Sequence, residues 1–144
     1  MAKSCGTFGG GRGCGGVNVL DENVTRDQAD LLQHWGIRFR SISRDYHRQG
    51  MQDDNIIPFL LRLKQPTLLT RDADFFERHL VHSRYCLAWF DVDAGQTAFF
   101  IRRFLSHPRF RTSAQRLGKV ICVAPRGVEY WSKTADQLTH VRWT

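Results

Sequence analysis

Short apolar runs alternate with amphipathic stretches from Val17 to the end of this 144-residue chain, and this alternation limits the possible folds more than any other feature. Strands that alternate with helices are typical of an α/β domain with a largely parallel sheet. The length fits one domain with a single hydrophobic core. We therefore expect one α/β domain over residues 17–144.

The first half of this domain divides into strands and helices at recognisable stop signals. Gly36 is well placed to end the first helix, and Pro58 must lie in the first turns of the second helix, where a missing N–H is tolerated. Pro66 then ends that second helix. The expected elements are a strand over Val17–Asp21, a helix over about Thr25–Trp35, a strand over Ile37–Ile42, a helix over Asp53–Lys64 and a strand over Thr67–Thr70.

The second half closes with a hairpin. Its turn is Pro125-Arg126-Gly127, between the strands Lys119–Ala124 and Val128–Ser132. The remaining expected elements are a helical turn around Asp74–Arg78, a buried strand over Tyr85–Phe90, an amphipathic stretch over Gly95–Ser106 and a final edge strand over Leu138–Trp143.

Residues 1–16 hold most of the glycines and few hydrophobic side chains. Such a composition does not repay the entropy of ordering its backbone, so we interpret this segment as a flexible leader. The alternatives are an extended or misassigned start, and an RNA-contacting arm through Lys3 and Arg12.

The chain has no stretch of about 18 apolar residues to span a membrane and no charged-then-apolar N-terminal signal, so we expect a cytoplasmic protein. The four cysteines form no C-x-x-C pair, and Cys86 and Cys122 sit in apolar runs, which favours free thiols. His79, His82 and Cys86 lack a fourth ligand, which argues against structural zinc.

Four aspartates fall at the expected ends of strands or the start of a helix, where chemistry in an open α/β sheet gathers. They are Asp21, Asp53, Asp72 and Asp74, with Glu22, Asn23 and Asp54 as second-tier ligands or supports. Carboxylates gathered in one place repel each other and are usually neutralised by a divalent cation, and Mg²⁺ or Mn²⁺ suits an all-oxygen set. Two such ions about 4 Å apart can orient a water for attack on a phosphodiester.

Each aspartate has a structural alternative. Asp before a helix is a favoured N-cap, and Asp in a turn bonds its own backbone. Taken singly, Asp53 and Asp72 fit capping well. The set of four, most of them beside another acidic or amide residue, favours a metal-dependent nuclease.

These segments also carry a family resemblance. V-L-D-E-N-V, then W-G-I-R-F-R-S-I before a G-x-x-D-x-x-I-I helix, then T-L-L-T-R-D-A-D-F resemble PIN-like nucleases, in particular the short bacterial branch related to VapC-type toxins. The resemblance covers about residues 17–131. It implies a three-layer α/β/α fold, Mg²⁺- or Mn²⁺-dependent hydrolysis of RNA, and often an antitoxin partner, with Asp21, Asp53, Asp72 and Asp74 as catalytic metal ligands.

Two features depart from the family pattern. The better-studied PIN toxins place a glutamate in a middle helix, where the nearest equivalent here is Asp53, so the number of metal ions stays open. The glycine-rich leader has no counterpart. A second hypothesis is therefore a PIN-like binding or regulatory protein with little catalysis, and domains of this size often form homodimers.

The net charge of +7 suggests a polyanionic partner. Residues 102–116 hold five arginines and no acid, interleaved with Phe104 and Phe110. This run fits a nucleic-acid surface or a solvated helix face, and the two are compatible if the charges face outward and the rings inward. The expected RNA contacts are Arg71, Arg102, Arg103, Arg109 and Arg111.

Overall fold

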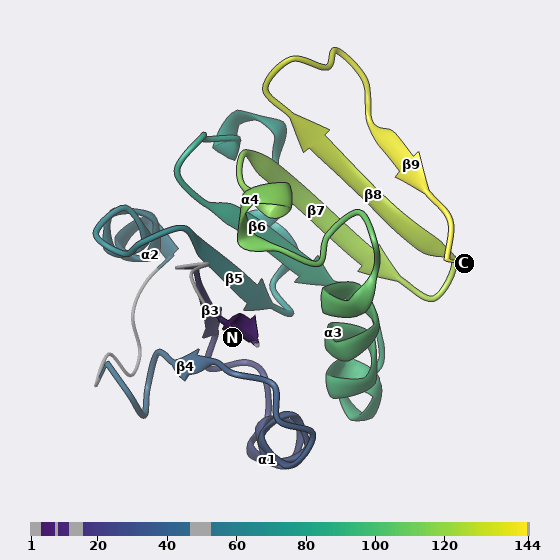
Figure 1. The fold of residues 1–144 in the computed structure, drawn as a ribbon. Coiled ribbons are helices and arrows are strands. Elements are labelled where there is room, and N and C mark those ends of the chain that lie inside the picture. The colour runs from purple at the N-terminus through teal and green to yellow at the C-terminus, as the bar shows by residue number, and fades with distance from the viewer. Residues whose placement is uncertain (1–3, 8, 12–15, 47–52, 144) are drawn as a thin grey trace.

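A seven-stranded sheet forms the centre of the molecule (Figure 1). The computed structural model describes residues 4–7, 9–11, 16–46 and 53–143, with the backbone alone for 4–7, 9–11, 53 and 54. The five strands from β4 to β7 run parallel, and the last two are antiparallel. The spatial order is β4 (Arg40–Ser41), β3 (Val17–Leu20), β5 (Pro66–Thr70), β6 (Cys86–Phe90), β7 (Lys119–Ala124), β8 (Gly127–Ser132) and β9 (Thr139–Val141).

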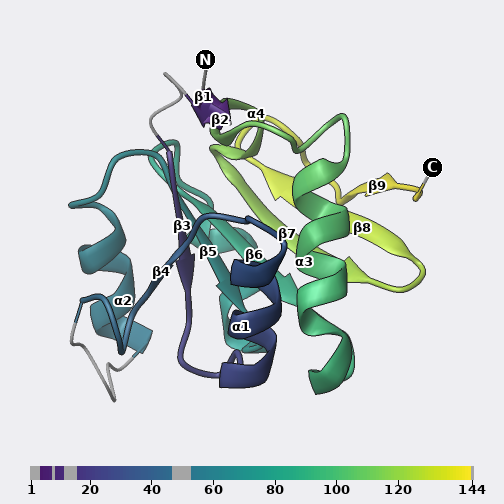
Figure 2. The ribbon, with the colours of Figure 1, turned by 60° about the horizontal axis from the view of Figure 1, so that its bottom comes forward.

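Helices cover both faces of this sheet (Figure 2). Helices α1 (Arg26–His34) and α3 (Thr97–Ser106) pack on one face, and α2 (Asp53–Leu60) packs on the other. Side chains of a strand alternate between its faces, so Leu69 joins the core under α1 and α3 while Leu68 joins the core under α2. The expected α/β class with a mainly parallel sheet and a C-terminal hairpin is confirmed.

The connection from α1 to β4 is tighter than the sequence predicts. Gly36 has φ of +78° and ends the helix, as expected. Ile37, however, donates its N–H to the Leu32 carbonyl, which places it in the helix end rather than in a strand. The prediction of a strand over Ile37–Ile42 is therefore wrong in extent, because only Arg40–Ser41 pair with β3.

Helix α2 ends four residues earlier than predicted. Two overlapping four-residue turns follow it, with Arg62 N–H donating to the Phe59 carbonyl and Leu63 N–H to the Leu60 carbonyl. Pro58 is the sixth residue of the helix rather than part of its first turn, so it removes a hydrogen bond from a short helix. Pro66 does not end the helix but begins β5, where a strand tolerates proline.

The other predicted elements agree with the structure within a few residues. The helical turn expected around Asp74–Arg78 is two 3₁₀ turns, η1 (Ala73–Phe75) and η2 (Arg78–Leu80). The amphipathic stretch over Gly95–Ser106 divides into η3 (Ala94–Gln96) and α3. Phe104 and Phe110 are buried, which confirms that the rings of the arginine-rich run face inward.

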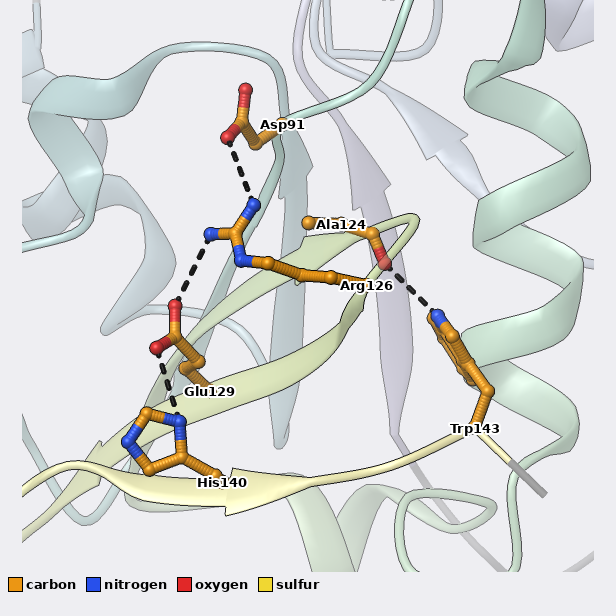
Figure 3. Close-up of polar contacts among 6 residues, drawn as sticks. All are labelled: Asp91, Ala124, Arg126, Glu129, His140 and Trp143. Atoms are coloured by element: carbon orange, nitrogen blue, oxygen red, sulfur yellow. Dashed lines mark hydrogen bonds and ion pairs between the residues drawn. The ribbon is translucent and has the colours of Figure 1, made fainter.

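Ion pairs and a hydrogen bond connect the C-terminal tail with the β7–β8 turn and β8 (Figure 3). Arg126 in that turn lies 3.8 Å from Asp91 and 3.3 Å from Glu129, and Glu129 also contacts Nδ1 of His140 on β9 at 3.1 Å. The indole Nε1 of Trp143 donates to the Ala124 carbonyl. These contacts hold β9 as the last strand of the sheet.

A buried arginine joins segments at the opposite, amino end of the strands. Arg116 closes the short helix α4 (Ser113–Arg116), whose N-terminus has a capping box. Its guanidinium donates to the Thr67 hydroxyl at 2.9 Å, the Phe110 carbonyl at 2.7 Å and the Asn18 side chain at 3.2 Å. One side chain thus connects β3, β5 and the segment after α3.

Within residues 1–16, where composition predicts a flexible leader, β1 (Ser4–Thr7) and β2 (Gly9–Gly11) form an antiparallel pair. Lys3 and Arg12, the two charges of the alternative RNA-contacting arm, lie outside the described residues. Cys86 and Cys122 are free and buried, as expected, and burial raises the pKa of each thiol to about 12. In the described part of the chain, every helix is too short or too polar to cross a bilayer.

Candidate active site

Two of the predicted acids meet at the carboxyl edge of the sheet, the lower edge in Figure 2. Strands β3 and β5 are parallel neighbours with Leu20 opposite Leu69, so the residues that follow them leave the sheet side by side. The Asp21 N–H extends the ladder by donating to the Leu69 carbonyl at 3.0 Å. This register places Asp21 beside Thr70 and close to Asp72.

The Thr70 hydroxyl is the centre of the site. It is fully buried at the end of β5 and donates to Oδ2 of Asp21 at 2.7 Å. The hydroxyl oxygen accepts from the Asn23 amide at 3.2 Å and from the Asp72 backbone N–H at 3.1 Å. One hydroxyl therefore fixes the positions of the two carboxylate residues and of the amide between them.

Asp21 is a buried acid with nearby negative charge. Only 7% of its surface is exposed, and this burial raises its pKa above the ordinary value of 3.8. The hydrogen bond from Thr70 and the one from the Glu22 backbone N–H, at 2.8 Å, act in the opposite direction. The charges of Glu22 and Asp72 raise the pKa further. Such a carboxylate gains from any cation that reaches it.

Asp72 has the capping role that the structural alternative predicts, and Asp74 supplies the N–H that it caps. Oδ1 of Asp72 accepts the Asp74 backbone N–H at 2.9 Å and caps η1. The Asp74 side chain is exposed. Asp72 is thus both a cap and an aspartate close enough to raise the pKa of Asp21, whereas Asp74 joins the site through its backbone.

The predicted ligands on α2 have a known backbone position only. A helix that connects two parallel strands runs antiparallel to them, so α2, which joins β4 to β5, begins at the carboxyl edge of the sheet (Figure 2). Asp53 and Asp54 are its first two residues, and their side chains lie outside the described part of the structure.

Asn23 and Arg71 connect the loops around the site. Oδ1 of Asn23 accepts the Arg71 backbone N–H at 3.0 Å, and the Arg71 guanidinium donates to the Val92 carbonyl at 3.2 Å. The loops that follow β3, β5 and β6 are thereby joined. Nε of Arg71 is buried and has no hydrogen-bond partner within the described residues. Arg71 therefore lies beside the candidate site, and its role as an RNA contact stays a prediction.

The other predicted RNA contacts lie away from this edge. Arg102 lies over the Trp35 ring at 4.8 Å, and Arg103 lies over Trp143 at 4.4 Å, so both arginines of α3 rest on aromatic rings. Arg109 donates to the Tyr130 hydroxyl at 3.2 Å. Arg109 and the exposed Arg111 follow α3, at the amino end of the parallel strands. These side chains do not border Asp21.

A pocket of about 470 Å³ opens beside Asp21 and Glu22. It lies between the start of α1 and the turn after β4, and its lining includes Arg26 and Arg44. Sequence reasoning missed both of these arginines and Thr70. The signal for Thr70 was a hydroxyl at the end of an apolar strand directly before Arg71-Asp72; the arginines become neighbours of Asp21 only through the fold.

The oxygen atoms at this edge are of the type that a hard cation such as Mg²⁺ prefers as ligands. Asp21, Glu22 and Asp72 supply carboxylate oxygens and Asn23 supplies an amide oxygen. The Thr70 hydroxyl oxygen already accepts hydrogen bonds from Asn23 and from the Asp72 N–H. The fit is incomplete in geometry, because no three His, Cys, Asp or Glu side chains of the described residues already surround one point. Among the described side chains, Asp21 and Asp72 are the predicted ligands that this edge brings together.

Comparisons with protein-family models, with curated proteins and with solved structures each found no match. The likeness to PIN-like nucleases therefore rests on the segments around Asp21, Asp53 and Asp72, and the site itself rests on the contacts described above.

Proposed function

We propose that this chain is a Mg²⁺- or Mn²⁺-dependent endoribonuclease of the PIN-like, three-layer type. One observation carries the proposal: a buried aspartate, Asp21, is held beside Asp72 by the Thr70 hydroxyl at the carboxyl edge of a parallel sheet. A purely structural acid has little reason to be buried next to further negative charge, since each such neighbour raises the cost of ionising it.

Each residue has a definite task in this proposal. Asp21 and Asp72 hold the cation, with Asp53 as the acid that α2 contributes, and Thr70 orients Asp21. Arg26 and Arg44, which line the pocket, contact phosphate oxygens of the substrate. The bound cation supplies charge neutralisation at the scissile phosphate and activation of the attacking water. The VapC-like resemblance extends the proposal to the toxin of a toxin–antitoxin module.

The test pairs the site aspartates with an exposed one. Asp21→Asn and Asp72→Asn are expected to lose cleavage of a mixed single-stranded RNA pool in Mn²⁺ or Mg²⁺, and EDTA is expected to abolish wild-type cleavage. Asp30→Asn is the matched control, because Asp30 is exposed on α1 and outside the pocket. Full cleavage by Asp72→Asn would refute the proposal.

A second measurement detects the cation without catalysis. A cation that binds the folded state raises the melting temperature according to its concentration and affinity. Mn²⁺ is therefore expected to raise the melting temperature of the wild type and of Asp30→Asn, but not that of Asp21→Asn. An equal rise in all three proteins would place the ion elsewhere.

A second candidate function is RNA binding or regulation with little catalysis. Both carboxylate oxygens of Asp21 already accept hydrogen bonds, from the Glu22 backbone and from Thr70, which favours a site that positions groups over one that holds a cation. RNA binding that EDTA leaves unchanged, with no product from the wild type, would support this candidate.

A further inference from the structure

A groove lies near the β4 edge of the sheet. Its volume is about 750 Å³, larger than the pocket beside Asp21. The start of β3, the end of α1 and the turn after β4 form its walls. The side chains that matter for recognition are Asn18, Arg38, Phe39, Arg40 and Arg44.

The groove is basic and carries an aromatic ring. Arg38, Arg40 and Arg44 are all exposed. Phe39, between Arg38 and Arg40 in the sequence, is half-buried and packs partly against the core under α1 and α3. The Arg44 guanidinium lies 5.7 Å from the centre of the Phe39 ring. Among the described lining residues one is acidic, Asp45, and its carboxylate accepts the Ser41 backbone N–H at 2.7 Å. The net field of the groove therefore attracts an anion.

The groove neighbours the candidate active site and shares one lining residue with it. Arg44 lines both cavities, and the chain leads from Arg38 through β4 to the turn that borders the Asp21 pocket. An extended polymer that lies in the groove would thus place one of its phosphates at the mouth of that pocket. A small anion, by contrast, would contact only one end of the groove.

We propose that this edge groove binds a single strand of RNA and leads it to Asp21. Arginines spaced along a strand match the repeating phosphates of a nucleic-acid backbone, and an aromatic side chain between them stacks with an unpaired base. A duplex keeps its bases stacked inside, so Phe39 favours a single strand. The delivery of RNA to Asp21 rests on the proposed nuclease function, whereas the binding itself does not.

Binding is tested in the Asp21→Asn background with EDTA, so that no substrate is consumed. The probe is a fluorescein-labelled single-stranded RNA of mixed sequence, followed by anisotropy at several salt concentrations. The double variant Arg38→Glu/Arg40→Glu is expected to bind at least about tenfold more weakly. The slope of log affinity against log salt is expected to become shallower by about 0.7 for each phosphate that an arginine no longer neutralises.

A substitution at Phe39 separates stacking from charge. Phe39→Leu keeps an apolar side chain and removes the aromatic face, so affinity for the single strand is expected to fall about tenfold at an unchanged salt slope. A hairpin duplex of the same sequence is expected to lose less affinity. An equal loss for both probes would contradict a stacking role for Phe39.

Two controls decide where the RNA lies. Lys133→Glu reverses one exposed charge after β8, far from β4 in the strand order, and is expected to change affinity less than about twofold. Arg102→Glu/Arg103→Glu makes the same double charge reversal on α3. If the α3 variant loses binding while Arg38→Glu/Arg40→Glu, called the β4 variant, binds like its parent, the groove proposal is overturned. Circular dichroism confirms that each variant is folded.

The groove and the nuclease proposals fail in different ways. Normal RNA binding by the β4 variant, together with metal-dependent cleavage by the wild type, would refute the groove and keep the nuclease. Loss of binding in the β4 variant, with no cleavage by the wild type, would keep the groove and refute the nuclease.

Discussion

Replacing Thr70 with valine tests the central hydrogen bonds of the site. Valine has nearly the same shape and suits a strand, so Thr70→Val removes the hydroxyl while leaving little empty space. The hydroxyl donates to Asp21 at 2.7 Å and accepts from the Asp72 backbone N–H at 3.1 Å and from Asn23 at 3.2 Å. Asn23 retains its bond to Oδ2 of Asp21 at 3.4 Å, but the Asp72 N–H is left without an acceptor.

The expected decrease in unfolding free energy follows from these bonds. A hydrogen bond to a charged group contributes about 1.5–3 kcal/mol, and an unpaired buried donor costs about 1–3 kcal/mol. Because Asp72 is only partly buried, water replaces some of its missing bond, and we expect a total of about 2–4 kcal/mol from these two terms. Thr70→Ser keeps the hydroxyl and removes one buried methyl group, which costs about 1 kcal/mol.

The same substitution should also change the pH dependence of cleavage. The Thr70 hydrogen bond lowers the pKa of Asp21 against the effect of burial, so its removal raises that pKa further. If the ionised carboxylate is required, the acidic limb of the activity profile moves to higher pH in Thr70→Val and stays in place in Thr70→Ser.

Urea unfolding with linear extrapolation measures the change in stability. Initial rates between about pH 4 and 8, a range that covers the titration of a carboxyl group with a raised pKa, measure the shift of the acidic limb. A valine variant at least as stable as the serine variant would refute the reasoning about the Thr70 network. An acidic limb that moves to lower pH would refute the proposed link between Thr70 and the Asp21 carboxylate.

Three further outcomes are expected. The folded state raises the pKa of Asp21, so its contribution to stability is fully present below the unfolded pKa near 3.8 and is lost as pH rises through the folded pKa. Asp21→Asn should therefore gain stability relative to wild type as pH rises from acidic to neutral, measured by urea titration. Arg116→Met should lower the free energy of unfolding by about 2–4 kcal/mol, because it leaves the Phe110 carbonyl without its hydrogen-bond donor. A decrease below about 1 kcal/mol would contradict the anchoring role of Arg116. Arg126→Gln should cost under about 1 kcal/mol and less still in high salt, since Arg126 is mostly exposed; a salt-independent effect in thermal melts would contradict a surface ion pair.

Much of the fold was predictable because its central strands are buried on both faces. The run Pro66–Thr70 is buried throughout, and such runs stand out in a sequence without any knowledge of the partner strands. The ends of helices and strands were harder to predict. Ile37 has the side chain of a strand residue, yet its N–H is taken by the end of α1, and hydrogen-bond competition of this kind depends on three-dimensional position.

The residues of the candidate site also include some that the sequence predicts and some that only the structure reveals. Asp21 and Asp72 were predictable because parallel neighbouring strands end together, which is a rule of topology. Thr70 was missed because a threonine in an apolar strand is ordinarily a β-former, and only its hydrogen bonds reveal the hydroxyl as an anchor. Arg44 was missed because it reaches the Asp21 pocket through the turn after β4, whose path no local pattern encodes.

The two outermost strands of the sheet, β4 with two residues and β9 with three, are its shortest. An edge strand exposes unpaired backbone groups, and a long, apolar edge invites pairing with other chains and fibre growth. Here the interior strands carry the apolar length, while the edges are brief and bear Arg40 and His140. A wide, strongly apolar sheet is thereby protected from templated aggregation, which should allow refolding at high protein concentration.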